Sequence, residues 1–414
     1  MKQMGLLLLA GMVVGCDARG ASESTRSSTP PLVHENPQPA LDEAAAWRVD
    51  TNAAVTIGAG DPRAAAGDTL YEFNDIIGAQ FLGDGRIVVA VMGSYALRFY
   101  DAAGTFVGSA GRRGEGPGEF RQILKLFRMR GDTLAVNDYH VEVDWFDASG
   151  GTITSGRARR RGLVQLQTVA MLENGTYFGI VATGFQRGDR LQQRQLGLVR
   201  VRAERGEVDT VAVLPGIFET IRAPGASPEM AVFTPHMLIA VLEDSLVTAS
   251  SASYELQIRG ADGQVGRVIR RELEGTPVST ELKERYRSYA LNRRDEKGQP
   301  FSERWRQQRE RFFARDPFVD TLPRIQDILV SRDGDIWVAH YSAASEFRRN
   351  WSVGTQWQDH PTAWDVFERS GRWLTTVTLP SRFTLLDVSG QLVLGLVANE
   401  DEEQGVRVLR LEKP

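Results

Sequence analysis

The chain has 414 residues and a formal net charge of −4, with 42% hydrophobic and 25% charged residues. This composition is typical of a soluble globular protein. The near-balanced charge excludes a bulk attraction to nucleic acid. The single cysteine, Cys16, excludes a disulfide framework and a cysteine-based metal site. The length allows one large domain or two or three ordinary ones.

The N-terminus has the features of a bacterial lipoprotein signal. Lys2 supplies a positive charge, and residues 5–14 form an apolar run that is too short to span a bilayer. Residues 13–16 read Val-Val-Gly-Cys, which resembles a lipobox, although Val14 is a mild departure from that pattern. We therefore expect residues 1–16 to be a signal peptide with lipid attached at Cys16, and the protein to lie in the bacterial cell envelope, periplasmic or on the outer surface.

Residues 17–46 are rich in Ser, Thr, Pro, Ala and acidic residues. Such a segment has too little apolar content to form a core, so it is predicted to be a disordered tether. Ordered structure is expected to begin at Trp47, with a short strand at residues 55–57.

The rest of the chain repeats one pattern, an apolar strand, a tight turn and a second apolar strand. The clearest copy is residues 76–120, where Asp84 and Gly85 form a turn able to adopt positive φ angles. Short strands of this kind bury both faces when neighbouring sheets stack radially. The sequence therefore predicts an all-β fold, a six-bladed β-propeller over residues 47–414. The six predicted turns lie at residues 84–85, 131–132, 174–175, 243–244, 333–334 and 389–390.

The sixth unit has only three strands, so the strand near residues 47–57 is predicted to complete it and close the ring. Two insertions interrupt the repeats. Residues 215–235 contain Gly and Pro and are predicted to be a loop. Residues 279–316 show apolar residues at helical spacing and predict two helices between blades four and five. Their eleven basic and seven acidic residues suit a helical flap with a solvated face better than a lipid-binding surface.

Residues 111–120 read GRRGEGPGEF, which resembles the glycine-rich connector of NHL-repeat propellers. The segments DGRIVVAV and LRFYDAAG resemble the strands of the same repeat. Residues 47–414 as a whole resemble the six-bladed NHL-like propeller lipoproteins of bacteria. This resemblance implies a fold rather than a function, because propellers include both enzymes and binding proteins.

The sequence contains no GxSxG, HExxH or Walker motif. Counting a fixed number of residues from each predicted turn places one set of polar residues at one mouth of the channel. Two acids, one Arg and one His suit a hydrogen-bonding mouth better than a metal cage, so neither a metal nor a cofactor is expected. Asp138 and His340 could instead transfer protons as a pair, or be structural. The candidate ligand-binding residues are Asp75, Gln122, Asp138, Gln165, Arg324 and His340.

Two functions remain open at this level. The favoured one is a non-catalytic binding or scaffold module, tethered to the membrane by its lipid, for a polar small molecule or a protein partner. The alternative is a metal-dependent hydrolase, lactonase or lyase that acts in the central channel, as in similar propellers. The small number of carboxylates at the predicted mouth favours binding over catalysis. No catalytic residue is predicted, and no nucleic-acid partner is expected.

Overall fold

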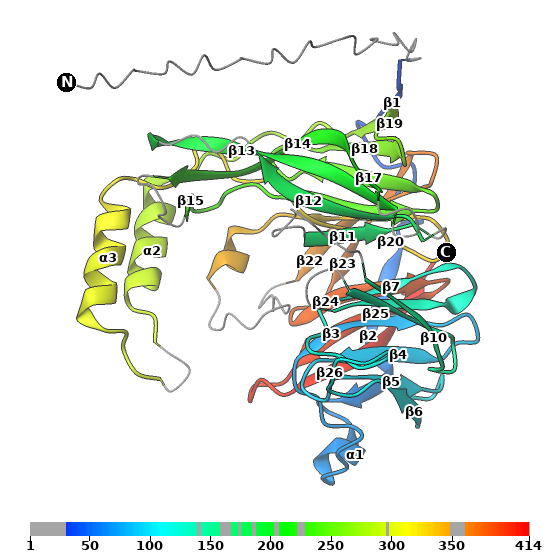
Figure 1. The fold of residues 1–414 in the computed structure, drawn as a ribbon. Helices are drawn as coiled ribbons and strands as arrows, with labels where there is room; N and C mark the ends of the chain where they lie inside the picture. The colour runs from blue at the N-terminus through cyan, green and yellow to red at the C-terminus, as the bar shows by residue number, and fades with distance from the viewer. Residues whose placement is uncertain are drawn as a thin grey trace, which may run out of the picture. The chain divides into compact units, whose positions relative to one another are not determined.

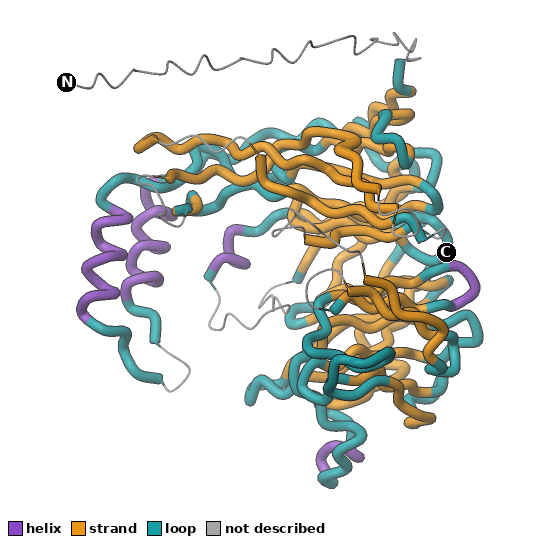
Figure 2. Tube along the Cα trace, in the orientation of Figure 1, coloured by secondary structure: helices purple, strands orange, loops and turns teal. Residues whose placement is uncertain are grey.

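The computed structural model is built mainly from strands (Figure 2). One compact unit spans Pro31–Pro414. Cys16 and Gln165 lie outside the residues that the structure describes. The described residues are 30–138, 142–157, 167–172, 175–183, 188–202, 207–221, 228–294, 298–347 and 361–413.

The described residues form six sheets of four or five strands (Figure 1). The first sheet contains β3 (Ile76–Phe81), β4 (Ile87–Val91), β5 (Ala96–Tyr100) and β6 (Phe106–Ala110). The second contains β7 (Lys125–Arg128), β8 (Leu134–Asn137), β9 (Glu142–Phe146) and β10 (Thr152–Arg157). The third contains β11 (Gln167–Met171), β12 (Tyr177–Thr183), β13 (Gly188–Arg202), β14 (Glu207–Ile221) and β15 (Glu229–Met230).

The other three sheets follow the same plan. The fourth contains β16 (Met237–Leu242), β17 (Ser245–Ser250), β18 (Glu255–Gly260), β19 (Val265–Arg270) and β1 (Leu32–Glu35). The fifth contains β20 (Ile325–Val330), β21 (Ile336–His340), β22 (Thr362–Phe367) and β23 (Trp373–Leu379). The sixth contains β24 (Phe383–Ser389), β25 (Leu392–Ala398), β26 (Gln404–Glu412) and β2 (Arg48–Gly58).

Each sheet begins with a hairpin whose first strand is an edge strand of that sheet. The six first strands are β3, β7, β11, β16, β20 and β24. Neighbouring first strands contact one another: β3 contacts β7 and β24, while β20 contacts β16 and β24. Sheets arranged in this way around their first strands are consistent with a β-propeller.

The hairpin turns explain why the strands start and end where they do. At the first turn Gly85 has a φ of 86° and donates its N–H to the Leu82 carbonyl at 3.0 Å. Gly334, in the turn between β20 and β21, has a φ of 89°. These left-handed conformations favour glycine, so the Asp-Gly pairs seen in the sequence reverse the chain at these positions.

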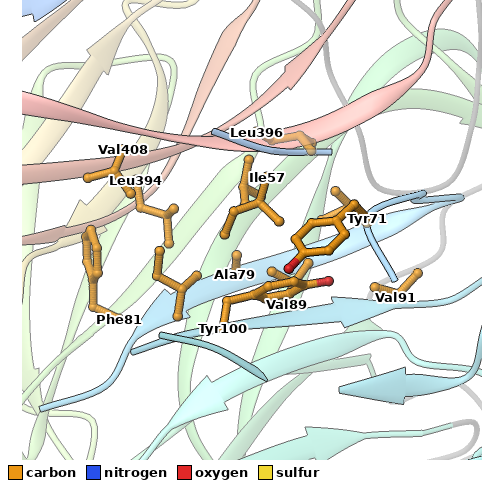
Figure 3. Packing of buried hydrophobic residues seen from close by; sticks show 13 residues of the cluster. Ile57, Tyr71, Ala79, Phe81, Val89, Val91, Tyr100, Leu394, Leu396 and Val408 are labelled. Atoms are coloured by element: carbon orange, nitrogen blue, oxygen red, sulfur yellow. The ribbon is translucent and has the colours of Figure 1, made fainter. Parts of the chain in front are cut away.

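The cores lie between neighbouring sheets. One core cluster joins β3 and β4 of the first sheet to β25, β26 and β2 of the sixth (Figure 3). Ile57, Val89, Tyr100 and Leu394 are all fully buried within it. Further clusters lie between the other pairs of neighbouring sheets, so each sheet buries both faces, and such packing stabilises short strands.

The predicted closing strand is present. β2 pairs antiparallel with β26, from Arg48 opposite Glu412 to Gly58 opposite Gly405. The β2 strand therefore completes the last sheet, and this part of the prediction is confirmed. The β2 strand brings Ile57 into the core between the first and sixth sheets.

Two predictions about irregular segments are wrong in part. The predicted tether does not continue to residue 46, because β1 pairs parallel with β19 and the Asn36 side chain donates to the Gly371 carbonyl at 3.1 Å. The free backbone groups of an edge strand attract a further strand regardless of its composition. The predicted loop at residues 215–235 is also partly strand, because β14 continues to Ile221 and β15 pairs with it.

Two helices, α2 (Thr280–Leu291) and α3 (Glu303–Phe313), lie between β19 and β20 in the chain. Ser279 and Ser302 cap their N-termini. Tyr286 of α2 and Phe313 of α3 belong to one apolar cluster with Phe233, so the helices are held by packing. A short helix, α1 (Pro62–Ala65), follows β2. Within the described part of the chain, none of the helices has the length and apolar character needed to cross a membrane.

The closure should be testable by a single truncation. Ile57→Ala removes most of a fully buried side chain from the core between the two sheets, so we expect a loss of about 2–5 kcal/mol in the free energy of unfolding. Chemical denaturation measures this. Thr51→Ala, at an exposed position of the same strand, is the matched control and should change stability by less than about 0.5 kcal/mol. Equal effects of the two substitutions would contradict the closure by β2.

Candidate functional site

A cavity of about 550 Å³ is lined by the first strands of all six sheets. Its wall includes Gln80 of β3, Lys125 of β7, Val169 of β11, Ile239 of β16 and Leu329 of β20. Leu386 of β24 completes the lining. The cavity is therefore the channel around which the six sheets are arranged.

The lining strands are edge strands, so each carries backbone N–H and C=O groups that have no strand partner on the channel side. Channel side chains bind several of these groups. Gln80 Nε2 donates to the Leu126 carbonyl at 3.2 Å, and Lys125 Nζ donates to the Val169 carbonyl at 2.8 Å. Asp387 Oδ2 accepts the Phe81 N–H at 2.9 Å. Polar side chains thus link neighbouring sheets across the channel.

Three ion pairs lie at the end of the channel wall nearest the hairpin turns. Arg128 Nη1 lies 3.0 Å from Asp387 Oδ2. Burial raises the pKa of the Asp387 carboxyl, and the nearby Arg128 guanidinium opposes that rise. Arg332 Nη2 lies 3.0 Å from Asp132 Oδ1, and Asp132 also accepts the Gly83 N–H at 2.6 Å.

A third pair joins Arg369 and Glu243 at 2.7 Å. The three acids in the cavity lining, Asp132, Glu243 and Asp387, are therefore each paired with an arginine. Across the described residues, no three His, Cys, Asp or Glu side chains are grouped closely enough to hold a metal ion.

Two further charges lie deeper along the strands. Lys125 is the first residue of β7, and Asp327 follows a bulge in β20. Both side chains are exposed by surface area, yet many protein atoms lie around each one, and these cause the desolvation that shifts their pKa values. Burial lowers the pKa of the Lys125 ammonium, which Asp327 partly offsets. Burial raises the pKa of the Asp327 carboxyl to about 6. The hydrogen bond from the Ile328 N–H and the charge of Lys125 each lower this pKa, but by less than burial raises it.

Five of the six residues predicted for the mouth are described, and each lies next to the end of a first or second strand. Asp75 precedes β3 and has a φ of 58°, and Gln122 precedes β7. Asp138 follows β8, is almost fully buried, and accepts the N–H groups of Arg121 at 3.1 Å and Gln122 at 2.8 Å. Asp138 thus holds the connector that leads into β7.

Arg324 and His340 lie together at the start of β20 and the end of β21. The Arg324 guanidinium donates to the carbonyls of Leu273, at 2.9 Å, and Ala252. These contacts fix the segment before β20, and they engage the guanidinium with the protein's own backbone. The Tyr341 N–H donates to the Arg324 carbonyl at 3.0 Å, which fixes the segment after His340.

His340 belongs to a buried network centred on Asp365 of β22. Asp365 is fully buried, and one of its oxygens lies 2.9 Å from His340 Nε2 and 2.5 Å from the Tyr254 hydroxyl. Arg271 also donates to it, and Thr376 donates to its other oxygen at 2.6 Å. Burial alone would raise the pKa of Asp365, but the hydrogen bonds from His340, Thr376 and Tyr254 bring it below its ordinary value.

The network connects two sheets, because Tyr254 and Arg271 flank strands of the fourth and Asp365 lies in the fifth. The Arg271 guanidinium also lies over the Trp373 ring, 4.0 Å from its centroid. Burial and the Asp365 charge raise the pKa of Tyr254 well above its ordinary value, so Tyr254 stays protonated and donates. Arg271 Nη1 also lies 3.1 Å from His340 Nε2, so His340 takes part in the contacts that join the two sheets.

Sequence reasoning missed Lys125, Asp327, Asp365 and Asp387. The three aspartates lie inside strands that are otherwise largely apolar, and Lys125 begins a strand directly before Leu126 and Phe127. That pattern was the available signal, because a charge within a buried strand needs a partner or a function.

No family model matches the chain, and no curated protein matches it either. Several solved structures are similar. One is a member of the DUF4221 family from Bacteroides vulgatus, with a TM-score of 0.48 and 10% identity over 89% of this chain and 99% of that one. Another, from Bacteroides fragilis and described as exported, has a TM-score of 0.46 and 10% identity over 93% and 100%. Virginiamycin B lyase from Staphylococcus aureus has a TM-score of 0.37 and 8% identity over 81% and 96%. At such values none of these similarities indicates a function.

Asp365→Asn tests the buried network. The variant leaves His340 and Arg271 without their carboxylate, so we expect a loss of about 3–5 kcal/mol in the free energy of unfolding at pH 7. The pKa of Asp365 is lowered in the folded protein. Its contribution is therefore complete above the unfolded pKa of about 3.9 and is lost as the pH falls through the folded value.

Denaturation at pH 7 and at about pH 3 measures both effects. Thr376→Val is the matched control, because it removes one donor and should cost about 1 kcal/mol. If Asp365→Asn lowered the free energy of unfolding by as much at the lower pH as at pH 7, the stabilising role given to the Asp365 charge would be contradicted.

Asp327→Asn should change the stability in the opposite direction, so that the variant is more stable than the wild type at high pH. Because the folded pKa of Asp327 is raised to about 6, its ionisation destabilises the fold as the pH rises from about 4 to about 7. We expect the variant to have a higher melting temperature than the wild type at pH 8 and a similar one at pH 4. Asp401→Asn, at an exposed turn position, should show no such trend. A variant that is less stable at pH 8 would refute the prediction.

Proposed function

We propose that the chain is a lipid-anchored, six-bladed propeller of the bacterial cell envelope that binds a small polar ligand in its channel without transforming it. The observation that carries this proposal is the cavity of about 550 Å³ lined by the first strands of all six sheets. Its volume lies within the range of small-molecule binding sites. Its wall combines apolar side chains with backbone and side-chain hydrogen-bonding groups.

The six sheets are interpreted as six blades. This interpretation is supported by the contacts between neighbouring first strands and by the completion of the last sheet by β2. The helices α2 and α3 are interpreted as an insertion between the fourth and fifth blades, packed through the cluster that contains Phe233.

The chemistry of the channel favours binding over metal-dependent turnover. Asp132, Asp387 and Glu243 each pair with an arginine. A carboxylate bound to a guanidinium is a poor ligand for a hard cation, which wants several free oxygens converging. The metal-dependent hydrolase, lactonase or lyase is therefore the second candidate.

The mouth residues have a supporting role in this proposal. Asp75, Gln122, Arg324 and His340 form a polar rim, and Asp138 positions the connector beside Gln122. Ligand recognition is assigned mainly to the channel wall, because Arg324 and His340 already bind groups of the protein.

The lipid at Cys16 is proposed as the membrane contact, and the exterior of the sheets remains available to a protein partner. Support comes from the sequence of residues 1–16, with its apolar run and lipobox-like end.

Cysteine protection tests the location of the ligand site. Cys16 is the only cysteine of the chain, so a Cys16→Ser background allows single reporters. Gln80→Cys places a thiol in the cavity wall on β3, and Ser109→Cys places one on the exposed outer strand β6 of the same sheet. Millimolar sugars, amino acids and dipeptides are screened for slower alkylation by iodoacetamide.

A binding compound should slow alkylation at residue 80 several-fold and leave residue 109 unchanged. If no compound slows residue 80, or if both positions respond equally, the channel is not the site. Stoichiometric metal in the purified protein, with a hydrolytic activity that a chelator abolishes, would favour the enzyme instead.

The lipid anchor has its own test. Mass spectrometry of the N-terminal peptide from a bacterial membrane fraction should show Cys16 as an acylated N-terminal residue. The Cys16→Ser variant should move to the soluble fraction. An unmodified Cys16 in wild-type protein, or equal fractionation of the two proteins, would exclude the anchor.

A further inference from the structure

Two opposite charges on the first strands, Lys125 in the cavity wall and Asp327 next to it on β20, are left without an ion pair among the described residues. We propose that Lys125 and Asp327 bind the two charged ends of a zwitterionic ligand, an amino acid or a short peptide with free termini. The inference rests on the proposed binding function and names the class of its ligand. Lys125 pairs with the ligand carboxylate, and Asp327 pairs with the ligand ammonium group.

The other channel charges are already engaged. Arg128, Arg332 and Arg369 each bind a carboxylate at 3.0 Å or less. Within the described residues, neither Lys125 nor Asp327 forms an ion pair, either with the other or with a third residue. Lys125 Nζ donates to the Val169 carbonyl and lies 5.2 Å from the centroid of the Phe127 ring, and Asp327 Oδ1 accepts the Ile328 N–H at 2.8 Å.

Lys125 lines the cavity, and Asp327 directly precedes the lining residues Ile328 and Leu329 of β20. β7 and β20 are the first strands of opposite sheets. Between them lie β3 and β24 on one side and β11 and β16 on the other. Lys125 and Asp327 lie six and seven residues before the turn glycines Gly131 and Gly334, and so at similar depths. Each charge partly offsets the shift that burial causes in the pKa of the other.

Both groups therefore lie in surroundings that disfavour their charge. Burial shifts the pKa of Lys125 downward and that of Asp327 upward, as expected of ions that lack a close counter-charge. Groups perturbed in this way are typical of functional sites. A ligand with one positive and one negative end would supply both counter-charges at once.

The surrounding wall fits the rest of such a ligand. Gln80 Oε1 is a buried acceptor with no hydrogen-bond partner among the described residues, and it suits an ammonium or amide N–H. Ile239 and Leu329 supply apolar surface for a side chain. Unpaired backbone groups of the lining strands suit a peptide bond.

The test uses isothermal titration calorimetry of the full-length protein at pH 7.5. The probes are the dipeptide alanyl-leucine, its N-acetylated form, its C-terminal amide, and glucose as a neutral polar compound. Acetylation removes the positive end and amidation removes the negative end. A lost charge-assisted contact should weaken binding about tenfold or more, so both modified dipeptides should bind at least that much more weakly than alanyl-leucine.

The variants Lys125→Gln and Asp327→Asn locate each contact. If Asp327 binds the ammonium group, N-acetylation should cost little further affinity in Asp327→Asn. If Lys125 binds the carboxylate, amidation should cost little further affinity in Lys125→Gln. Such non-additivity identifies direct partners. Lys413→Gln and Asp401→Asn are the matched controls, and both should retain the wild-type preference.

The outcomes separate this inference from the proposed function. Glucose or a blocked dipeptide that binds as well as alanyl-leucine, with protection of a cysteine at position 80, would overturn the zwitterion and keep the channel. Additive effects of ligand and protein changes would also overturn the two assigned contacts. Failure of every probe to bind, together with unprotected Gln80→Cys, would overturn both.

Discussion

The structure depends on how the backbone groups at the inner edge of six sheets are satisfied. An edge strand has a row of N–H and C=O groups with no strand partner, and here six such strands meet around one space. Unpaired polar groups are costly when they are buried. The protein binds some of them with side chains, such as Lys125 to Val169 and Asp387 to Phe81. The channel is polar for this structural reason before any ligand is considered.

The same constraint explains why many channel charges do not indicate function. Arg332 links the Phe81 carbonyl to Asp132, and in doing so joins three sheets. Asp365 does comparable work farther out, where it gathers donors from two sheets. Lys125 and Asp327 differ, because each carries a charge that forms no ion pair among the described residues. A protein that retains such groups despite their effect on stability commonly uses them for binding or chemistry.

Much of the fold could be predicted because its signals are local. The Asp84–Gly85 turn and the apolar strands around it are contained in a few residues, and the missing strand of the last unit indicated its replacement by β2. The position of β1 could not be predicted, since it depends on the free edge of β19, more than 200 residues away.

The site was less predictable than the fold. A fixed count from each turn correctly located Asp138 and His340 at strand ends, but not what their side chains bind, because the Asp365 network forms only when two sheets pack together. The proximity of Lys125 and Asp327 likewise depends on the whole arrangement of six sheets. Local sequence identified each only as a charge within an apolar strand.

Hydrogen exchange in the presence and absence of saturating alanyl-leucine tests the central claim, that the channel is the binding site, most directly. A ligand in the channel should cover the free N–H groups of the lining strands, so amides in β7 and β20 should exchange more slowly. Amides in the outer strands β6 and β23 should be unchanged. Slower exchange confined to the outer strands or to α2 and α3, with the lining strands unaffected, would contradict a channel site.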